Sequence, residues 1–508
     1  MYKKKVWMFV WIAALVLTLG LSPSLAKEFL VFDHPLSLLG YATQGAAFGM
    51  HNSYDTEAGS QAALMNLFVE GEYRISPKLK FYSSIKYTQD WAYQINAGRE
   101  SWNDKLFDKS KDHLNVDGNY WQIMNEAHVT LTPGNFFFRV GKQIVSWGEM
   151  DGFRLMDQIN PLDSRRGFGD VEFENTIIPI WLLRTEYYPR ISTGWLQDMA
   201  LEFVFNPNAD FIPNQDIFLG NNDAGIWAPM VKIDDPTVPR GSLYLGSTFN
   251  EVHKPSKWSR EGFEYAFRVK AVIKDTIITL NYFYGLENSP ILKVSAIDPL
   301  VSVASDGRLL LHLFQDGKFP LFRYVGVTAT RDIPFLKSAA LGGVAPVFRF
   351  ETFYAFSDTF LSPSNTFEKS DELRSAFGLD WKIKVPLLNP RAYFSVSPQV
   401  YYRRLMDLPP GGVQFTDTAA NLLKRNNWQG TLFLSTTYFN AKLVPSFFWL
   451  RDFTGKGDFF RIQTTYAWSN NWLATVGVML LDGKRPNVSF QAFDNKDNVF
   501  FKITYKWG

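Results

Sequence analysis

The sequence predicts an all-β protein, a transmembrane antiparallel β-barrel of about 18 strands with 16 as the second choice, and three observations support this prediction. Aromatic residues make up 16% of the chain and hydrophobic residues only 46%, so apolar residues are spread out rather than gathered into continuous cores. Apolar and polar residues alternate over many stretches, and short turn-forming segments alternate with long polar ones. Beyond the N-terminus no run of about 18 uninterrupted apolar residues occurs, which argues against a helical membrane protein.

The first 26 residues have the features of a secretory signal peptide. Three lysines at positions 3–5 precede an apolar stretch over residues 6–21, and Ser24-Leu25-Ala26 supplies small residues before a cleavage site. We expect cleavage after Ala26 and a mature chain of residues 27–508 that forms a single barrel domain in a Gram-negative outer membrane. The absence of cysteine excludes a disulfide scaffold and a thiolate metal site. A net charge of +2 gives no reason to expect a nucleic-acid partner.

Alternation predicts the individual strands. A strand that crosses a membrane in a barrel needs about 9 to 11 residues, with an apolar residue at every second position. Residues 121–131, 263–271, 377–383 and 460–468 show this pattern. The last residues, from Phe501 to Trp507, alternate in the same way and resemble the C-terminal signal that directs barrel proteins into the outer membrane. The barrel-assembly machinery is therefore an expected partner during insertion, although Gly508 follows the terminal aromatic residue.

The connections alternate between short and long. Short turns are expected at residues 76–78, 132–135, 189–194, 274–275, 332–337, 386–390, 440–441 and 469–470. Longer polar segments lie near residues 51–60, 94–118, 148–175, 206–259, 286–318, 357–369, 405–427, 452–458 and 482–497. Short periplasmic turns and long extracellular loops are typical of an outer-membrane barrel. Eight short and nine long connections join about 18 strands and leave both termini in the periplasm.

Charged residues at the polar positions of the strands are expected to line the lumen, because Arg or Lys on the lipid face costs about 2–4 kcal/mol at the midplane. The expected lumen wall includes Glu126, His128, Arg184, Glu186, Glu264, Arg268, Arg349, Glu351, Asp380 and Arg461. One interpretation is a hydrated wall cross-linked by salt bridges, and the other is a selectivity surface. Lys142 breaks the pattern, since alternation from Val140 turns it toward lipid. Either Gly141 forms a bulge or Lys142 reaches the interface.

Nothing in the sequence indicates catalysis. The six histidines are scattered, and none lies in a metal-ligand or nucleophile motif. His128 beside Glu126 could form an acid/base pair, but a hydrogen bond in the lumen is the simpler interpretation. We expect no enzyme activity, no catalytic residue, no metal and no cofactor.

The stretch from Phe136 to Asp163 begins as an alternating strand and breaks at Trp147-Gly148-Glu149 into a charged loop. The residues from Trp147 to Asn175 form the third long connection, where general porins fold a loop inward to narrow the pore. Asn160-Pro161 would end any short helix that begins near Met150. The candidates for a constriction are Arg139, Gln143, Trp147, Glu149, Arg154, Asp157, Asp163, Arg165 and Arg166. The alternative is an extracellular loop with solvated charges.

The longest loop, over residues 206–258, contains apolar clusters at 211–212, 217–219 and 227–230. Such clusters are unusual in a solvated loop. We therefore expect this loop to pack as a lid or plug.

Three short motifs resemble those of a known family. The motifs are Arg139-Val140-Gly141-Lys142-Gln143, Ser146-Trp147-Gly148-Glu149 and Ile159-Asn160-Pro161-Leu162-Asp163. They are similar to the hallmark of an uncharacterised proteobacterial barrel family, domain of unknown function 1302. The resemblance implies an outer-membrane location and no established activity, and it suggests work near lipid-export machinery.

Two functions remain open at this point. The leading hypothesis is a passive or gated channel that passes a solute across the outer membrane, with residues 147–175 as the constriction. The second is a non-conducting barrel that serves as a docking or binding component of a system that exports lipids or hydrophobic compounds. Outer-membrane lipid and lipopolysaccharide are expected partners in either case, and lipid-export components are partners in the second.

Overall fold

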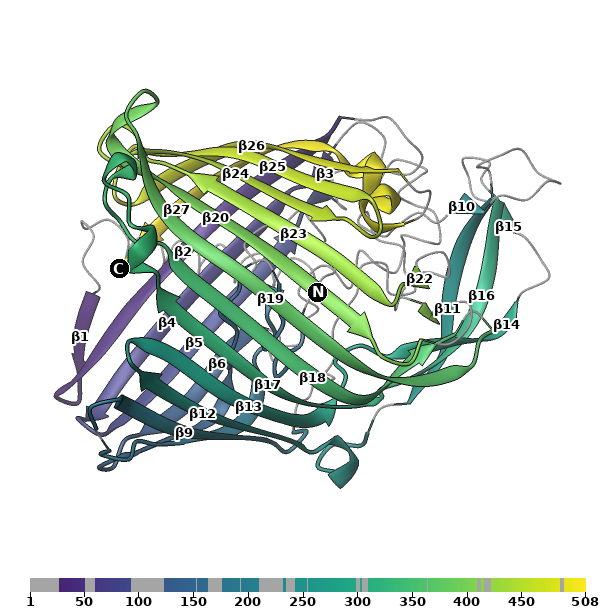
Figure 1. Cartoon of the computed structure of the whole chain (residues 1–508), viewed down its shortest axis with the longest axis horizontal. Coiled ribbons are helices and arrows are strands. Elements are labelled where there is room, and N and C mark those ends of the chain that lie inside the picture. The colour runs from purple at the N-terminus through teal and green to yellow at the C-terminus, as the bar shows by residue number, and fades with distance from the viewer. Residues whose placement is uncertain are drawn as a thin grey trace.

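The computed structural model describes residues 27–50, 60–92, 123–151, 153–162, 176–191, 193–209, 232–233, 243–253, 255–297, 302–303, 309–362, 364–408, 413–414, 422–484 and 488–508. Its main feature is a closed antiparallel barrel of 18 long strands (Figure 1), which confirms the predicted fold. The 18 strands are β2 (His34–Gly49), β4 (Leu64–Ser76), β5 (Leu79–Asp90), β6 (Met124–Leu131), β7 (Phe136–Gln143), β8 (Ile180–Tyr187), β9 (Leu196–Asn206), β12 (Glu264–Ile273), β13 (Thr276–Leu286), β17 (Leu321–Asp332), β18 (Val347–Leu361), β19 (Phe367–Val385), β20 (Asn389–Leu405), β23 (Asn426–Ser435), β24 (Leu443–Asp452), β25 (Gly457–Ala467), β26 (Trp472–Gly483) and β27 (Asn498–Trp507).

Shorter elements surround this ring. The strands β1 (Lys27–Val31), β3 (Ser60–Ala62), β21 (Val413–Gln414) and β22 (Leu422–Leu423) extend the same sheet. Four 3-10 helices are described: η3 (Arg260–Gly262), η4 (Pro334–Leu336), η5 (Ala339–Leu341) and η6 (Ser489–Lys496). Over the described residues, no helix combines the length and the apolar character that a membrane span requires.

The barrel closes where its last strand meets its first. β27 pairs with β2 from Gly40 opposite Trp507 to Gly49 opposite Asn498, and the hydroxyls of Thr43 and Thr504 lie 3.2 Å apart across this seam. A Cβ atom on Gly40 would lie 2.5 Å from the ring of Trp507. Glycine is therefore needed where the terminal aromatic ring crosses β2.

The eight predicted short turns join the strands at one end of the barrel, as expected. The segment between β17 and β18 is longer than predicted, because η4 and η5 lie within it. Two of the predicted long loops are wrong. In place of the loop predicted at 357–369, β18 extends to Leu361 and β19 begins at Phe367. In place of the loop predicted at 452–458, only residues 453–456 separate β24 from β25. Polar residues such as Asp358 look like loop residues in sequence, yet they extend the strand pairing opposite Ser370.

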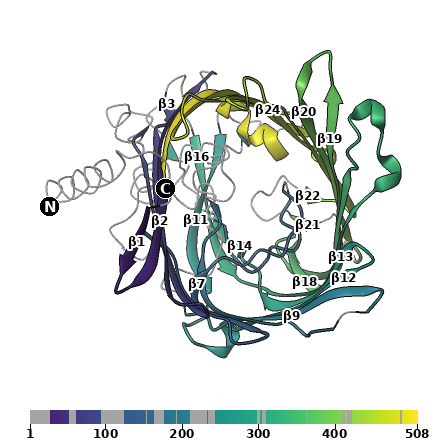
Figure 2. The ribbon, with the colours of Figure 1, turned by 90° about the vertical axis from the view of Figure 1, so that its left-hand side faces the viewer.

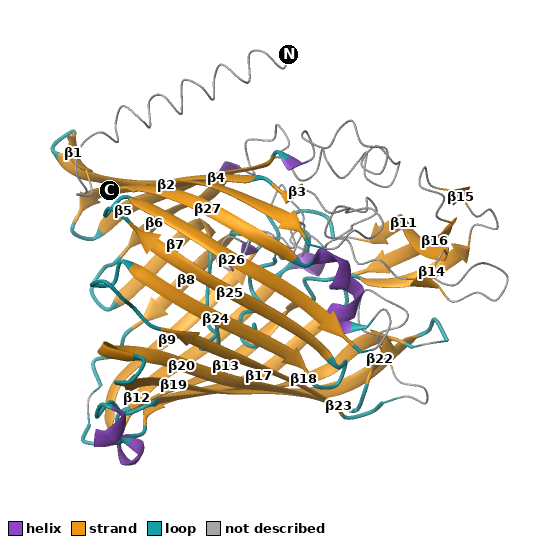
Figure 3. Ribbon diagram, turned by 90° about the horizontal axis from the view of Figure 1, so that it is seen from above, coloured by secondary structure: helices purple, strands orange, loops and turns teal. Residues whose placement is uncertain are grey.

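A second sheet lies beyond the long-loop end of the barrel (Figures 1 and 3). It contains β10 (Lys232–Ile233), β11 (Leu243–His253), β14 (Ile291–Ile297), β15 (Ser302–Val303) and β16 (Leu309–Lys318), and β11 pairs with β16 in parallel. The described part of the 206–258 loop contributes β10 and β11 to this separate sheet, and the expectation that the loop packs as a lid or plug stays a prediction. The apolar clusters of that loop lie outside the described residues.

Candidate functional site

The segment that follows β7 folds into the barrel (Figure 2). We call its described residues, 144–151 and 153–162, the inner segment. Its buried apolar side chains are Val145, Trp147, Met150, Leu155, Met156 and Ile159, and the wall residues that share their cluster are Ile180, Leu182, Val204, Ala266, Phe283, Phe322, Tyr324, Phe353, Ala355 and Ala376. These wall residues come from seven consecutive strands, β8 to β19, so the inner segment covers a broad part of the inner wall. The short helix considered near Met150 does not form in the described residues, which are irregular.

Glu351 on β18 holds the inner segment through the backbone. Its carboxylate accepts hydrogen bonds from the N–H groups of Glu149, Met150 (2.9 Å) and Met156 (3.3 Å). Glu351 has no exposed surface, so these donors replace its hydration. A buried carboxylate is tolerated only with such partners, and each charge-assisted hydrogen bond contributes about 1.5–3 kcal/mol.

Arg349 strengthens the same attachment from the same face of β18. Its guanidinium donates to the carbonyl of Glu149 and to Asp151 Oδ2 at 2.7 Å, both in the inner segment. It also donates to Asp380 Oδ1 on β19 at 2.8 Å. Arg349 therefore links the inner segment to two adjacent strands, and Tyr324 on β17 adds a third through a hydrogen bond to the carbonyl of Met156 (3.1 Å).

The inner segment is also shaped by its own side chains. Asp157 Oδ1 accepts hydrogen bonds from the N–H groups of Trp147 (2.5 Å) and Gly148 (2.8 Å). Asn160 accepts from the N–H of Val145 (2.8 Å) and donates to the carbonyl of Gln143 (3.1 Å). These bonds fold the segment back on itself and satisfy polar groups that burial would otherwise leave unpaired.

Two glycines in the wall make room for the inner segment. A Cβ atom on Gly326 in β17 would lie 2.6 Å from Met156 Cε, and one on Gly378 in β19 would lie 3.1 Å from Met150 Sδ. Real Cβ atoms essentially never approach to the first of these distances. Both methionines therefore lie directly over bare backbone.

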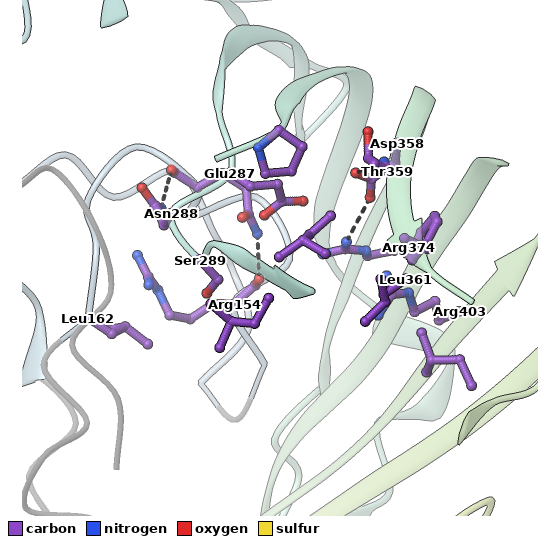
Figure 4. Close-up of a pocket in the computed structure, with 16 residues that line it drawn as sticks. Arg154, Leu162, Glu287, Asn288, Ser289, Asp358, Thr359, Leu361, Arg374 and Arg403 are labelled. Atoms are coloured by element: carbon purple, nitrogen blue, oxygen red, sulfur yellow. Dashed lines mark hydrogen bonds and ion pairs between the residues drawn. The ribbon is translucent and has the colours of Figure 1, made fainter. Parts of the chain in front are cut away.

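A cavity of about 260 Å³ lies between the inner segment and the long-loop ends of the strands (Figure 4). The inner segment contributes Arg154, Gln158 and Leu162, and the connection after β13 contributes Glu287, Asn288 and Ser289. The start of β14 contributes Ile291 and Leu292, and the barrel strands contribute Asp358, Thr359, Phe360, Leu361, Arg374 and Arg403. Asn288 donates a hydrogen bond to the carbonyl of Gln158 at 2.8 Å. The connection after β13 thus touches the inner segment beside the cavity.

The charged side of this cavity is a linked network. Glu372, which is fully buried, forms ion pairs with Arg374 and with Arg403 (2.7 Å). Arg374 also lies 3.8 Å from Asp358. With Arg154 on the opposite side and an apolar floor, the cavity can hold a small solute that has both charged and apolar parts.

Some of the predicted wall residues pair with one another and others contact different groups of the inner face. Arg184 forms ion pairs with Glu186 (2.6 Å) and Glu202 (2.8 Å), and the guanidinium of Arg268 lies 5.8 Å from the ring of Trp147. Further predicted residues form the contacts Arg139 to Thr130 (3.1 Å), Gln143 to the carbonyl of Leu182 (3.1 Å), Asn206 to Glu264 (2.7 Å) and Arg461 over the ring of Phe500 (4.8 Å).

Glu126 and His128 on β6 and Lys142 on β7 have other contacts than the Glu126–His128 pair and the Gly141 bulge considered from the sequence. Glu126 accepts a hydrogen bond from the N–H of Ile144 (2.9 Å), and the ring of His128 stacks on Tyr82 at 4.9 Å. Lys142 donates to the carbonyl of Met124 at 2.7 Å. The pairing of β7 continues through Gly141 without a register shift, so the bulge interpretation of Lys142 is wrong and the ammonium group reaches the outer end of β6.

Three constriction candidates, Asp163, Arg165 and Arg166, lie outside the described residues. The structure brings Trp147, Glu149 and Asp157 together with Glu351, Arg349 and Asp380. The methionines at 150 and 156 were missed, because an apolar residue in a charged loop gives no local signal of what it contacts. The charged network beside the cavity was also missed. Its signal in the sequence is that Glu372 and Arg374 lie two positions apart on one strand and therefore face the same side.

Comparison with known proteins gives a family and a set of distant barrels. No curated protein matches the sequence. Acinetobacter baumannii OccAB4 is 9% identical, with 93% of this chain and 97% of that chain covered and a TM-score of 0.47. Pseudomonas aeruginosa OpdK, solved with vanillate, is 7% identical, with 94% and 99% covered and a TM-score of 0.45. The family described as "Protein of unknown function (DUF1302)" matches residues 52–507, which include the whole inner segment, and the chain therefore belongs to this family.

Proposed function

We propose that the protein is an outer-membrane channel in which the inner segment is the constriction and must shift for a solute to pass. The attachment of the inner segment to Glu351 supports this proposal most strongly. One carboxylate receives three backbone N–H groups from a segment that lies across the lumen. The segment is covalently joined to the barrel only through β7 and β8. It could therefore leave the wall without breaking the barrel once this contact and those of Arg349 and Tyr324 are released.

The cavity beside the inner segment gives the solute a place to bind before it passes. It lies toward the long-loop end, which is extracellular in barrels of this type, and its lining includes Arg154 and Gln158 of the inner segment itself. A solute bound there would contact both the wall and the constriction. A solute can open the channel only if it binds more tightly when the inner segment is displaced than when the segment lies against the wall.

A second candidate is a non-conducting barrel that binds or docks for an export system for hydrophobic compounds. The apolar contacts between the inner segment and the wall favour it, since such packing excludes water from that part of the lumen. Under this candidate the inner segment never leaves the wall during function.

A reversible cross-link distinguishes the two. The chain has no cysteine, so the pair Met156→Cys and Gly326→Cys would be the only thiols, placed where Met156 lies over β17. Recorded in planar bilayers, the reduced pair should show openings that disappear on oxidation and return on reduction. Thr43→Cys with Thr504→Cys is the matched control, because it cross-links two adjacent strands without touching the inner segment.

The channel proposal predicts that the control conducts equally in both redox states. Shortening the inner segment should convert brief openings into steady current. If the wild-type, the reduced pair and the shortened protein are all electrically silent, the channel proposal is wrong. Silence together with copurified lipid would support the second candidate.

A further inference from the structure

An apolar groove of about 440 Å³ crosses the outer surface of five adjacent strands, β12 to β19. Its side chains form two cross-strand rows. The first row is Phe267, Tyr282, Val325, Tyr354 and Leu373, each opposite the next, and the second row is Val269, Leu280, Val327 and Thr352. Phe267, Leu280 and Val325 are among the exposed large apolar residues. The groove therefore faces the membrane and not the lumen.

The groove exists because small residues lie between large ones. The groove is lined on its middle strands by Val325, Val327 and Thr352, which we call its floor, and elsewhere by the aromatic residues Phe267, Tyr282 and Tyr354. The Thr352 hydroxyl lies 2.9 Å from the Ser375 hydroxyl and donates to the carbonyl of Arg374. Since this polar group is satisfied within the sheet, the floor presents apolar surface.

Exposed cations surround the end of the groove nearest the long loops. Arg323 lies two residues beyond Val325 on the same face of β17, and Arg404 pairs directly with Leu373. Lys369 lies further along β19 and is also exposed. Of the nearby acids, Asp371 already accepts the Tyr354 hydroxyl and the Ser357 N–H, both at 2.7 Å. These hydrogen bonds leave the Asp371 carboxylate charged, so the three exposed cations share this end of the groove with the acids Asp371 and Asp407 among the described residues.

We propose that this surface binds lipopolysaccharide, with an acyl chain in the groove and separate phosphate groups of the headgroup at Arg323 and at Arg404. An acyl chain matches a long apolar groove open to the membrane, and each buried CH₂ contributes about 0.8 kcal/mol. Basic side chains beside such a site recognise phosphorylated headgroups. The position of the cations at the extracellular end selects the outer-leaflet glycolipid over an inner-leaflet phospholipid.

The aromatic residues around the groove fit the same occupant. Tyr265 and Tyr284 flank its outer end in the row that contains Arg323, and tyrosines concentrate where a membrane meets water. The acyl chain would thus begin at the level of these rings. The site does not depend on whether the lumen conducts.

The test is a direct binding measurement on the delipidated full-length protein in detergent. Rough-type lipopolysaccharide and phosphatidylglycerol are titrated separately and bound lipid is counted by native mass spectrometry. We expect Arg323→Gln with Arg404→Gln to weaken lipopolysaccharide binding about tenfold or more, and Thr352→Phe, which fills the floor, to do the same. Two controls should bind like the wild-type: Arg190→Gln at the opposite rim, and Val476→Phe on the outward face of β26, where the side chain is 54% exposed.

The outcomes decide the proposal in each direction. Tighter binding of lipopolysaccharide than phosphatidylglycerol, lost in the groove variants and kept in the controls, supports it. Equal loss in groove and control variants overturns it, and so does phosphatidylglycerol binding as tightly as lipopolysaccharide. The circular dichroism spectrum shows whether a variant that loses binding still has its β-structure. The proposal requires that both the arginine variant and the threonine variant lose lipopolysaccharide binding while they remain folded.

Discussion

Glu351 and Met150 are 201 positions apart in the chain, yet the Met150 N–H lies 2.9 Å from the Glu351 carboxylate. The same carboxylate accepts two further backbone N–H groups of the inner segment. One wall residue thus determines the position of a loop that begins six strands earlier in the barrel order.

Replacing Glu351 should loosen the inner segment. Glu351→Ala removes the acceptor for three buried donors, each of which then costs about 1–3 kcal/mol, and Glu351→Gln keeps one acceptor oxygen without the charge. We expect amide hydrogen exchange at residues 149, 150 and 156 to accelerate at least tenfold in Glu351→Ala and less in Glu351→Gln. Asp458→Asn on β25, which pairs with Arg451, is the control. Unchanged exchange in Glu351→Ala would mean that apolar packing alone holds the segment.

Filling the space under Met156 should displace the inner segment by a different route. Gly326→Val places a side chain where a Cβ atom alone would lie 2.6 Å from Met156 Cε, and overpacking of this kind costs about 1–3 kcal/mol. We expect larger or longer openings in bilayer recordings. Adding Met156→Ala should restore much of the wild-type behaviour, because it removes the colliding atoms. Simple addition of the two single effects would contradict the contact.

The second sheet should separate from the barrel when Asn365 is changed. Asn365 lies in the turn between β18 and β19, accepts from the N–H of Val294 (3.0 Å) and donates to its carbonyl (2.7 Å), so it acts as an extra partner for the edge of β14. We expect Asn365→Gly, which tolerates the positive φ of 62°, to increase proteolysis between β13 and β17 several-fold. Asn365→Asp, which keeps the acceptor, should have a smaller effect. Equal cleavage in all three proteins would show that the sheet is held elsewhere.

Barrel closure should fail when Gly40 receives a branched side chain. Gly40→Val would collide with the ring of Trp507 and with the backbone of Phe68, so the β2 to β27 seam could not form. We expect less folded protein in the outer-membrane fraction and loss of the heat-dependent shift in gel mobility. Thr43→Val, three residues away on the same strand, removes only one hydroxyl contact and should fold nearly normally.

The barrel was predictable because its signals are local. A turn such as Thr132-Pro133-Gly134-Asn135 and the alternation before it lie within a few neighbouring residues, and the membrane imposes the same pattern on every strand. The two wrong loops, near Asp358 and Asp452, have the physical reason that strands beyond the membrane no longer need apolar residues. Polar composition there cannot distinguish a loop from an extended hairpin.

The site was predictable only in part. Alternation predicts that Arg349 and Glu351 face the lumen, and in the structure both residues contact the inner segment. The break at Trp147 marks where the strand β7 gives way to the inner segment. Neither observation could show that these residues meet, because the contact joins segments about 200 positions apart and depends on backbone donors that every residue possesses.

The position of Glu351 in the chain also sets an order of assembly. The inner segment follows the fifth strand of the ring, and Glu351 lies on the eleventh. Until both strands occupy the same barrel, the three N–H groups have no carboxylate and the six apolar side chains of the segment have no wall. Docking of this segment therefore reports that more than half of the ring has formed, which makes it an internal marker of barrel maturation.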